Sequence, residues 1–346
     1  MSAPSVSVII PSYNTARFIT ETLDSVFAQT FTDYEVIVVN DGSPDTPQLE
    51  IVLKPYFDRI VYLKQENRGL AGARNTGIRR ARGAFLAFLD SDDMWLPEFL
   101  AEQVQIFHKN PAVDLVYSDT FQFRKMLGMG TLVVRPLPFD RPLTFETLLK
   151  AECSIIASCT VVRKVPVIEA GLFDERLRRV EDYDLWLRIA FRGAKMAHHQ
   201  KALGLRRLHN ESLSADQKEM YEAWIGVMKK LAETLELSIQ ARMLVAETIR
   251  KAEAEMELFQ GNRHLLDSRP ELAEISLGRA YEFLRGRKLQ LTLLGLRIAP
   301  WLVAPIVKGW RHILAISEIT RAIAGGRLHW NWKHRQLYKT RLRSEP

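Results

Sequence analysis

The chain has 346 residues, of which 47% are hydrophobic and 26% charged, and its formal net charge is +7. This composition is typical of an ordinary globular protein, long enough for one domain of about 200 residues and a smaller second one. The two cysteines, Cys153 and Cys159, are too few for a disulfide framework, lack zinc-site partners at the usual spacing, and are expected to be reduced.

Strand and helix patterns alternate through the first 120 residues. The expected strands are Val6–Ile10, Tyr34–Asn40, Arg59–Lys64, Phe85–Leu89 and Val113–Ser118, and the expected helices are Ala16–Gln29, Gly72–Arg82 and Pro97–Lys109. This alternation predicts an α/β fold with a mostly parallel central sheet and helices on both faces. The strand Val6–Ile10 is too short for the apolar core of a signal peptide, so the folded body is expected to stay in the cytoplasm.

The second half of the chain is predicted to become helical. Phe121–Pro142 contains several glycines and prolines and suggests an insertion that contributes to an acceptor site. Later elements are expected at Thr144–Ala151 (helix), Ser154–Arg163 (strand), Glu181–Phe191 (helix), Ala215–Gln260 (helical) and Pro270–Gly286 (helical). We therefore expect a first domain at 1–214, a helical C-terminal region at 215–288 and a tail at 289–346.

The tail holds the net charge. Residues 301–346 contain nine Lys or Arg against two Glu, which leaves the first 300 residues neutral. Leu289–Val307 is apolar, but Arg297 and two prolines make it a poor transmembrane helix. An in-plane segment on an anionic membrane, followed by basic and Trp residues, fits better. The alternative is that the segment packs on the body and the basic end is solvated.

Three carboxylates follow the apolar strand Phe85–Leu89. Asp90, Asp92 and Asp93 come directly after it, and the carboxyl ends of strands in open α/β sheets are where ligands bind. Carboxylates held this close together favour a cation, and Mg²⁺ or Mn²⁺ carrying a diphosphate is the natural ligand. The alternative is a polar turn that caps the helix near Pro97.

Two other strand ends are expected at the same edge. Pro11 ends the first strand, and the ring of Tyr13 offers a face for a nucleotide base. Asp41 ends the second strand and could accept a hydrogen bond from a uracil N–H or a ribose hydroxyl. Taken alone, each of these segments is more often a simple turn.

A small-residue segment opens the helix that follows the third strand. Ala71 and its glycine neighbours allow a ligand to approach the backbone at a helix N-terminus, and Arg68 and Arg74 add positive charge. No dinucleotide fingerprint follows the first strand, and no phosphate-binding P-loop is present, so NAD-type and P-loop functions lose support.

Acids also stand at the start of the helix Glu181–Phe191. Without context, Glu181 and Asp182 are most simply residues that interact with the helix dipole. Further on, His209 is a lone histidine, which is more often structural than a ligand. The adjacent pair His198 and His199 has no acidic partner evident from the sequence.

Four of these segments together resemble the family 2 glycosyltransferases, which are inverting enzymes with the GT-A fold. They are, in order, Val-Ile-Ile-Pro-Ser-Tyr-Asn (8–14), Val-Asn-Asp-Gly-Ser (39–43), Asn-Arg-Gly-Leu-Ala-Gly-Ala-Arg-Asn (67–75) and Phe-Leu-Asp-Ser-Asp-Asp (88–93). The resemblance covers roughly residues 5–210. It implies the GT-A (nucleotide-diphospho-sugar transferase) fold.

The resemblance also implies roles for individual residues. Nucleotide-sugar binding falls to Pro11, Tyr13, Asp41, Arg68, Ala71, Arg74 and Asp90; metal binding falls to Asp90 and Asp92, the ends of a DxD motif, with His209 as a further candidate. Asp182 becomes the catalytic base, and Arg206 and Arg207 become candidate phosphate partners.

The expected function is metal-dependent transfer of a sugar, with inversion, from a nucleotide sugar to an acceptor hydroxyl. Family frequency favours UDP, and the acceptor is expected to be a glycan or a lipid-linked sugar in cell-surface polysaccharide or glycolipid synthesis. The enzyme is expected to be cytoplasmic, peripheral at the inner face of the membrane, with no nucleic-acid partner. The alternatives are a non-catalytic nucleotide-sugar-binding scaffold or sensor, a nucleotidyltransferase, and nucleic-acid binding through the tail.

Overall fold

The computed structural model describes residues 3–126, 129–134, 143–151, 153, 155–209, 216–301 and 303. Its strands are β1 (Val6–Ser12), β2 (Tyr34–Asp41), β3 (Val61–Gln65), β4 (Phe85–Phe88), β5 (Met94–Trp95), β6 (Leu115–Met126), β7 (Met129–Val134), β8 (Thr160–Arg163) and β9 (Met196–Arg207). Its α-helices are α1 (Ile19–Phe27), α2 (Thr46–Leu53), α3 (Gly69–Arg80), α4 (Phe99–Lys109), α5 (Phe145–Leu149), α6 (Lys164–Glu169), α7 (Glu181–Phe191), α8 (Gln217–Thr234), α9 (Ile239–Leu266), α10 (Pro270–Leu284) and α11 (Arg287–Ile298).

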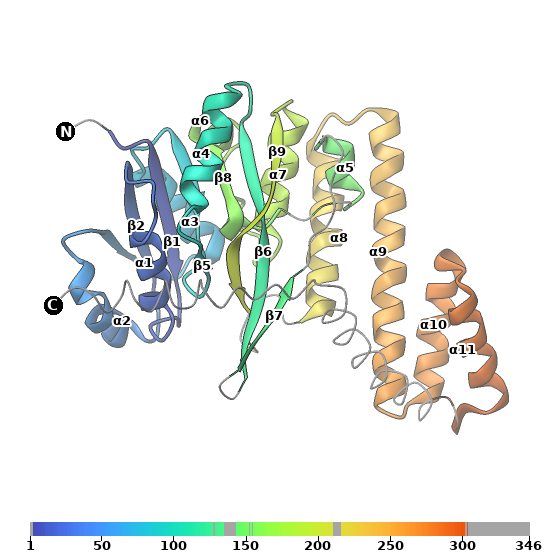
Figure 1. Ribbon diagram of the computed structural model, residues 1–346. Coiled ribbons are helices and arrows are strands. Elements are labelled where there is room, and N and C mark those ends of the chain that lie inside the picture. The colour runs from blue at the N-terminus through green and yellow to red at the C-terminus, as the bar shows by residue number, and fades with distance from the viewer. Residues whose placement is uncertain are drawn as a thin grey trace.

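The strands form a single sheet in the order β3-β2-β1-β4-β8-β6-β9-β5, with β7 paired to β6 (Figure 1). Strands β1 to β4 pair in parallel, β8 is antiparallel to both β4 and β6, and β9 is parallel to β6. The sheet is thus parallel in its first half and mixed in its second. The carboxyl ends of β1, β2 and β4 share one edge, which we call the ligand edge.

Both faces of the sheet are covered, which explains why the central strands β1, β2 and β4 are buried almost throughout and mainly apolar. In β1, Val8 and Ile10 point into one hydrophobic cluster and Ile9 into the other, as the two-residue period of a strand requires. Buried residues of α1, α2 and α4 complete the first cluster, and those of α3, α7 and α8 complete the second. The predicted α/β architecture is confirmed.

Several elements differ from expectation. Of the strand expected at 154–163, residues Thr160–Arg163 form β8, and Ala157–Cys159 before it form a 3₁₀ turn. The elements α2, α6 and β5 have no predicted counterpart. The expected insertion 121–142 begins as the continuation of β6, which turns back as β7; residues 135–142 lie outside the described part of the chain. The strand β9 has no counterpart among the predictions, because the polar run at 198–201 hides its strand pattern. The helical stretch 215–260 divides between α8 and α9, where the Ser238 side chain accepts the N–H of Ala241 and caps α9.

The helices beyond residue 215 belong to two clusters. Val227, Met228 and Leu231 of α8 join the core beneath the sheet, so the core continues past the boundary expected at 214/215. A separate small cluster joins the end of α9 to α10 and α11, which lie far from the sheet in Figure 1. No helix of the described residues is long and apolar enough to cross a bilayer. Of the expected tail, 304–346 lies outside the described residues.

Candidate active site

The ligand edge brings together the loops that follow β1, β2 and β4. The parallel register aligns Ser12 of β1 with Asn40 of β2, and Ile9 of β1 with Phe88 of β4. The two loops after β1 and β2 are also joined directly, because the Asn14 N–H donates to Ser43 Oγ at 2.7 Å. Tyr13 is 51% exposed, so a face of its ring is accessible to a ligand.

Asp41 is buried at the end of β2 and its carboxylate is fixed in place. Its Oδ1 accepts hydrogen bonds from Gln65 Nε2 at 2.6 Å and from the Arg68 N–H at 2.9 Å. The next residue, Gly42, has φ +64°, and a Cβ there would lie 2.7 Å from the Asn67 backbone nitrogen. Glycine is therefore required for the Asp41 turn to pack against the loop before α3.

Arg74 joins the two acidic segments of the site. Its Nη2 lies 2.7 Å from Asp90 Oδ1, its Nη1 donates to Glu181 Oε1, and its side chain is fully buried. Asp90 and Glu181 therefore lie within the span of one guanidinium group. The start of α7, with Asp182, consequently faces the acids at the ligand edge.

The other residues expected to bind the nucleotide sugar, Ala71, Arg68 and Pro11, are buried or paired with protein groups. Ala71 is buried, and Arg68 forms an ion pair with Glu175 at 2.6 Å. Pro11 is buried within β1, which continues through Ser12 paired with Asn40, so Pro11 does not end the strand as expected. In this structure Arg74 holds the site together, while Arg68 lies at its exposed rim.

Asp182 is half-buried in the first turn of α7. Burial raises the pKa of its carboxyl, the positive charge of Arg74 and the N–H groups of Tyr183 and Ala157 oppose that shift, and the charge of Asp90 adds to it. Burial likewise raises the pKa of Glu181, against the opposing charge of Arg74. A carboxylate that is accessible and made more basic by its surroundings is suited to accept a proton.

The end of β9 is anchored to the acidic loop after β4. The N–H of Arg207 donates to Asp93 Oδ1 at 2.9 Å, and its Nε donates to the Asp92 carbonyl at 2.9 Å. The Arg207 guanidinium also pairs with Glu21 at 2.6 Å. Arg207 is thus engaged by protein groups, and its expected role as a phosphate partner has no support from this geometry.

This anchoring carries His209 to Asp92. The His209 Nε2 lies 2.8 Å from Asp92 Oδ2. Burial and the charge of Asp90 raise the pKa of Asp92, while His209 opposes the shift. The Asp92 carboxylate and the His209 imidazole, both of which can bind a metal ion, therefore lie side by side. The nearby charge of Asp90 adds negative charge at this position.

This donor set fits a divalent ion held partly by substrate. Within the described ranges, no group of three or more His, Cys, Asp or Glu side chains is arranged to hold a metal ion. Mg²⁺ and Mn²⁺ sites of diphosphate enzymes commonly use one or two carboxylates and complete the shell with phosphate oxygens and water. Asp92 and His209, with Asp90 beside them, match that pattern.

Several partners were not evident from the sequence. His198 pairs with Asp119 at 2.8 Å and His199 with Glu102 at 3.0 Å, so both histidines have the acidic partners that sequence reasoning did not find. Lys230 of α8 contacts Asp184 of α7 at 2.7 Å and thereby fixes α8 against the helix that carries Asp182. Such pairs join distant segments, and no local pattern signals them.

Comparison with known proteins identifies similar glycosyltransferases. The sequence model of the family described as Glycosyl transferase family 2 matches residues 7–169, which excludes Asp182 and His209. An uncharacterized glycosyltransferase of Rickettsia prowazekii is 34% identical over 239 residues, which cover 67% of this chain and 74% of that protein. One from Rickettsia bellii is 32% identical over 237 residues and covers 66% of this chain, but the match spans only 34% of the relative's length.

Solved structures share the fold. Staphylococcus aureus TarS (residues 1–349), in complex with UDP-GlcNAc, superposes with a TM-score of 0.57 at 18% identity and covers 89% of this chain and 92% of its own. The mannosyltransferase PcManGT of Pyrobaculum calidifontis, in complex with GDP-Man and Mn²⁺, gives 0.58 at 19% identity, with 93% and 88% covered.

Proposed function

The chain belongs to glycosyl transferase family 2, and we propose that it transfers a sugar, with inversion and with the help of a divalent metal, from a nucleotide sugar to an acceptor hydroxyl. The observation that carries this proposal is the double ion pair of Arg74 with Asp90 and Glu181. Because Arg74 joins these two segments, the candidate base Asp182, next to Glu181, lies opposite the acids proposed to hold the diphosphate and its metal ion.

The donor is proposed to bind along the ligand edge. The exposed ring of Tyr13 stacks on the base, the fixed carboxylate of Asp41 accepts a hydrogen bond from base or ribose, and Asp90 lies towards the ribose or the metal. TarS has been solved with UDP and UDP-GlcNAc, and PcManGT with GDP-Man. We favour a UDP-sugar for this chain.

Asp92 and His209, with Asp90, would hold Mg²⁺ or Mn²⁺. When bound there, the ion supplies positive charge to the departing diphosphate. The presence of Mn²⁺ in the PcManGT complex supports this choice.

Asp182 acts as the general base. Its carboxylate accepts the proton of the acceptor hydroxyl while that oxygen forms its bond to the anomeric carbon and the bond to the diphosphate breaks on the opposite face. Arg74, through its ion pairs with Asp90 and Glu181, holds the start of α7, with Asp182, beside Asp90. A single displacement of this kind inverts the anomeric configuration and needs no covalent sugar intermediate.

The acceptor is proposed to be a glycan or a lipid-linked sugar, in surface polysaccharide or glycolipid synthesis on the cytoplasmic side of the membrane. Support comes from α11, whose Leu291, Leu294 and Ile298 are exposed, together with Trp301. Arg287 and Lys288 begin the same helix. Apolar and basic side chains in this arrangement suit an anionic bilayer surface.

A vesicle assay tests the membrane contact. The full chain should sediment with vesicles containing phosphatidylglycerol and stay in solution with phosphatidylcholine alone, and added salt should weaken binding. Leu294→Asp should reduce sedimentation. Equal sedimentation of the two proteins would contradict a role for α11.

A nucleotide-release assay tests the enzyme. The protein is incubated with a panel of UDP- and GDP-sugars, with Mn²⁺ or with EDTA, and release of nucleotide is measured. Release from one donor should require the metal, and Asp182→Asn should reduce transfer by roughly 10²–10⁴-fold while UDP binding persists. Glu146→Gln, an exposed acid in the first turn of another helix, is the matched control.

Two outcomes would redirect the proposal. Metal-dependent UDP binding without turnover on any donor and acceptor would favour a non-catalytic scaffold. Normal transfer by Asp182→Asn would show that another group accepts the proton.

A further inference from the structure

A cavity of about 330 Å³ lies beside the helix that carries Asp182. It opens between the end of α5, the segment before α7, the first half of α8 and the middle of α9. Its lining residues are Lys150, Ala151, Val180, Gln217, Met220, Tyr221, Trp224, Thr248, Lys251, Ala252 and Glu255. Its size is at the lower end of the range for small-ligand sites.

The lining combines aromatic surface with hydrogen-bonding groups. The half-buried Met220, Tyr221 and Trp224 form one wall, and Ala252 lies buried among the lining residues. Exposed Gln217 and Lys251, like Lys150 and the half-buried Glu255, supply donors and acceptors around it. Flat apolar faces bordered by polar groups match a sugar ring, which presents C–H groups on its faces and hydroxyls around its edge.

The cavity is held in a fixed relation to the candidate base. Val180, which lines it, lies two residues before Asp182 and has φ 61°, a left-handed conformation at the start of α7. The ring of Trp224 packs 6.3 Å from that of Tyr183, the residue after Asp182.

Ion pairs also join α8 to α7 and to the segment before it. Lys230 of α8 contacts Asp184 of α7 and Asp174, both at 2.7 Å. Arg179 forms an ion pair with Glu219 of α8. A ligand bound against α8 is therefore positioned relative to Asp182 by rigid elements, as acceptor binding requires.

We propose that this cavity, between α8, α9 and the start of α7, is an acceptor subsite that binds a sugar ring of the acceptor on Trp224 and Tyr221. The inference rests on the proposed function and adds to it the place and chemistry of acceptor recognition. It also gives α8 a direct part in the specificity of the enzyme.

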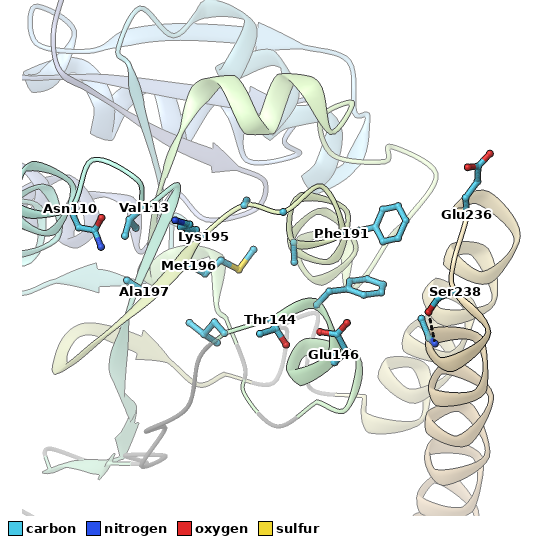
Figure 2. A pocket seen from close by; sticks show the side chains of 16 residues that line it. Asn110, Val113, Thr144, Glu146, Phe191, Lys195, Met196, Ala197, Glu236 and Ser238 are labelled. Carbon is cyan, nitrogen blue, oxygen red and sulfur yellow. Dashed lines mark hydrogen bonds between the residues drawn. The ribbon is translucent and has the colours of Figure 1, made fainter.

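A second cavity provides a matched control. It has a volume of about 760 Å³ and is also lined by an aromatic side chain, Phe191, together with Thr144, Glu146 and Lys195 (Figure 2). It lies where β6 and β9 begin, near Val113 and Met196, and both strands run parallel to β4. That is the edge opposite the ligand edge, so an acceptor bound there could not reach Asp182.

Saturation-transfer NMR with methyl α- and β-glycosides of common hexoses and N-acetylhexosamines tests the proposal on the full chain. At least one glycoside should bind the wild type, and Trp224→Ala should weaken its binding by about 10-fold or more, since an aromatic platform is lost. Lys251→Ala, at an exposed position, should weaken it to a smaller extent. Phe191→Ala should leave the affinity unchanged.

UDP binding with Mn²⁺, measured by calorimetry on each variant, separates this inference from the proposed function. It should be the same in the wild type, Trp224→Ala and Lys251→Ala, which also shows that the variants are folded. Glycoside binding that is absent from the wild type, or unaffected by both Trp224→Ala and Lys251→Ala, overturns the subsite. Loss of UDP binding in the wild type would instead overturn the donor site.

Discussion

His209 Nε2 lies 2.8 Å from Asp92 Oδ2, although 117 residues separate the two in the chain. The contact depends on the strand before it, because Arg207 at the end of β9 is hydrogen-bonded to Asp93 and to the Asp92 carbonyl. A strand that was not predicted thus delivers the imidazole to the acidic loop. The Asp92 carboxylate and the His209 imidazole, which follows this strand, therefore lie close enough to bind one cation.

Removal of this imidazole should weaken metal binding. We expect His209→Ala to raise the Mn²⁺ concentration needed for half-maximal UDP binding by roughly 10–100-fold, the range seen when groups supporting a metal site are removed. The measurement is a Mn²⁺ titration at fixed UDP. His108→Ala, an exposed histidine in the last turn of α4, is the control and should match the wild type. Identical titrations for His209→Ala and the wild type would exclude His209 from the metal shell.

The environment of Asp182 predicts the acid limb of the pH–rate profile. A base works only when ionised, and burial raises the pKa of this carboxyl. The rate should therefore fall, as pH decreases, at a higher pH than the value of about 3.9 for a solvated aspartate would give. Because the charge of Arg74 opposes the shift, Arg74→Gln should move the limb to still higher pH.

The profile is measured as kcat against pH with saturating donor and acceptor. Arg79→Gln is the control, since Arg79 lies on the same helix but is exposed and pairs with Glu175. An acid limb that stays in place in Arg74→Gln, with transfer still measurable, would show that the titrating group is distant from Arg74.

Arg74 should also be important for stability. Arg74→Met leaves Glu181 buried without its cation and removes the partner of Asp90, which is about a third exposed. Loss of one partner of a buried ion pair costs about 3–5 kcal/mol, and the exposure of Asp90 places the expectation near the lower figure. Urea unfolding at neutral pH measures it. Arg79→Met should change the free energy of unfolding by less than about 1 kcal/mol.

Sequence reasoning predicted the parts of the site that depend on short, continuous segments of the chain. The ends of β1, β2 and β4 lie close to the residues where apolar runs stop, Pro11, Asp41 and Asp90, and parallel pairing then places them at one edge. The family resemblance added Asp182, which residue types alone describe equally well as a helix-dipole residue.

The rest depends on pairs of distant residues. Nothing local shows that Arg74 binds Glu181, 107 positions away, or that His198 meets Asp119 across neighbouring strands. Sequence alone presented Arg74 as positive charge for a ligand, whereas both of its terminal nitrogens contact protein carboxylates. Long-range ion pairs of this kind follow from the assembled fold and have no signature in periodicity or spacing.

The turn after β2 offers a test of how backbone geometry supports the donor site. Gly42→Ala places a Cβ 2.7 Å from the Asn67 backbone nitrogen at φ +64°, so it should destabilise the protein by roughly 1–3 kcal/mol and weaken UDP binding by displacing Asp41. Gly226→Ala is the matched control, because Gly226 lies in α8 with no neighbouring atom within 4 Å of an added Cβ. That variant should stabilise the protein by about 0.5–1 kcal/mol, since alanine favours the helix. Thermal unfolding and UDP calorimetry compare the two, and a Gly42→Ala variant as stable as Gly226→Ala would mean that the Asp41 turn is not held against Asn67.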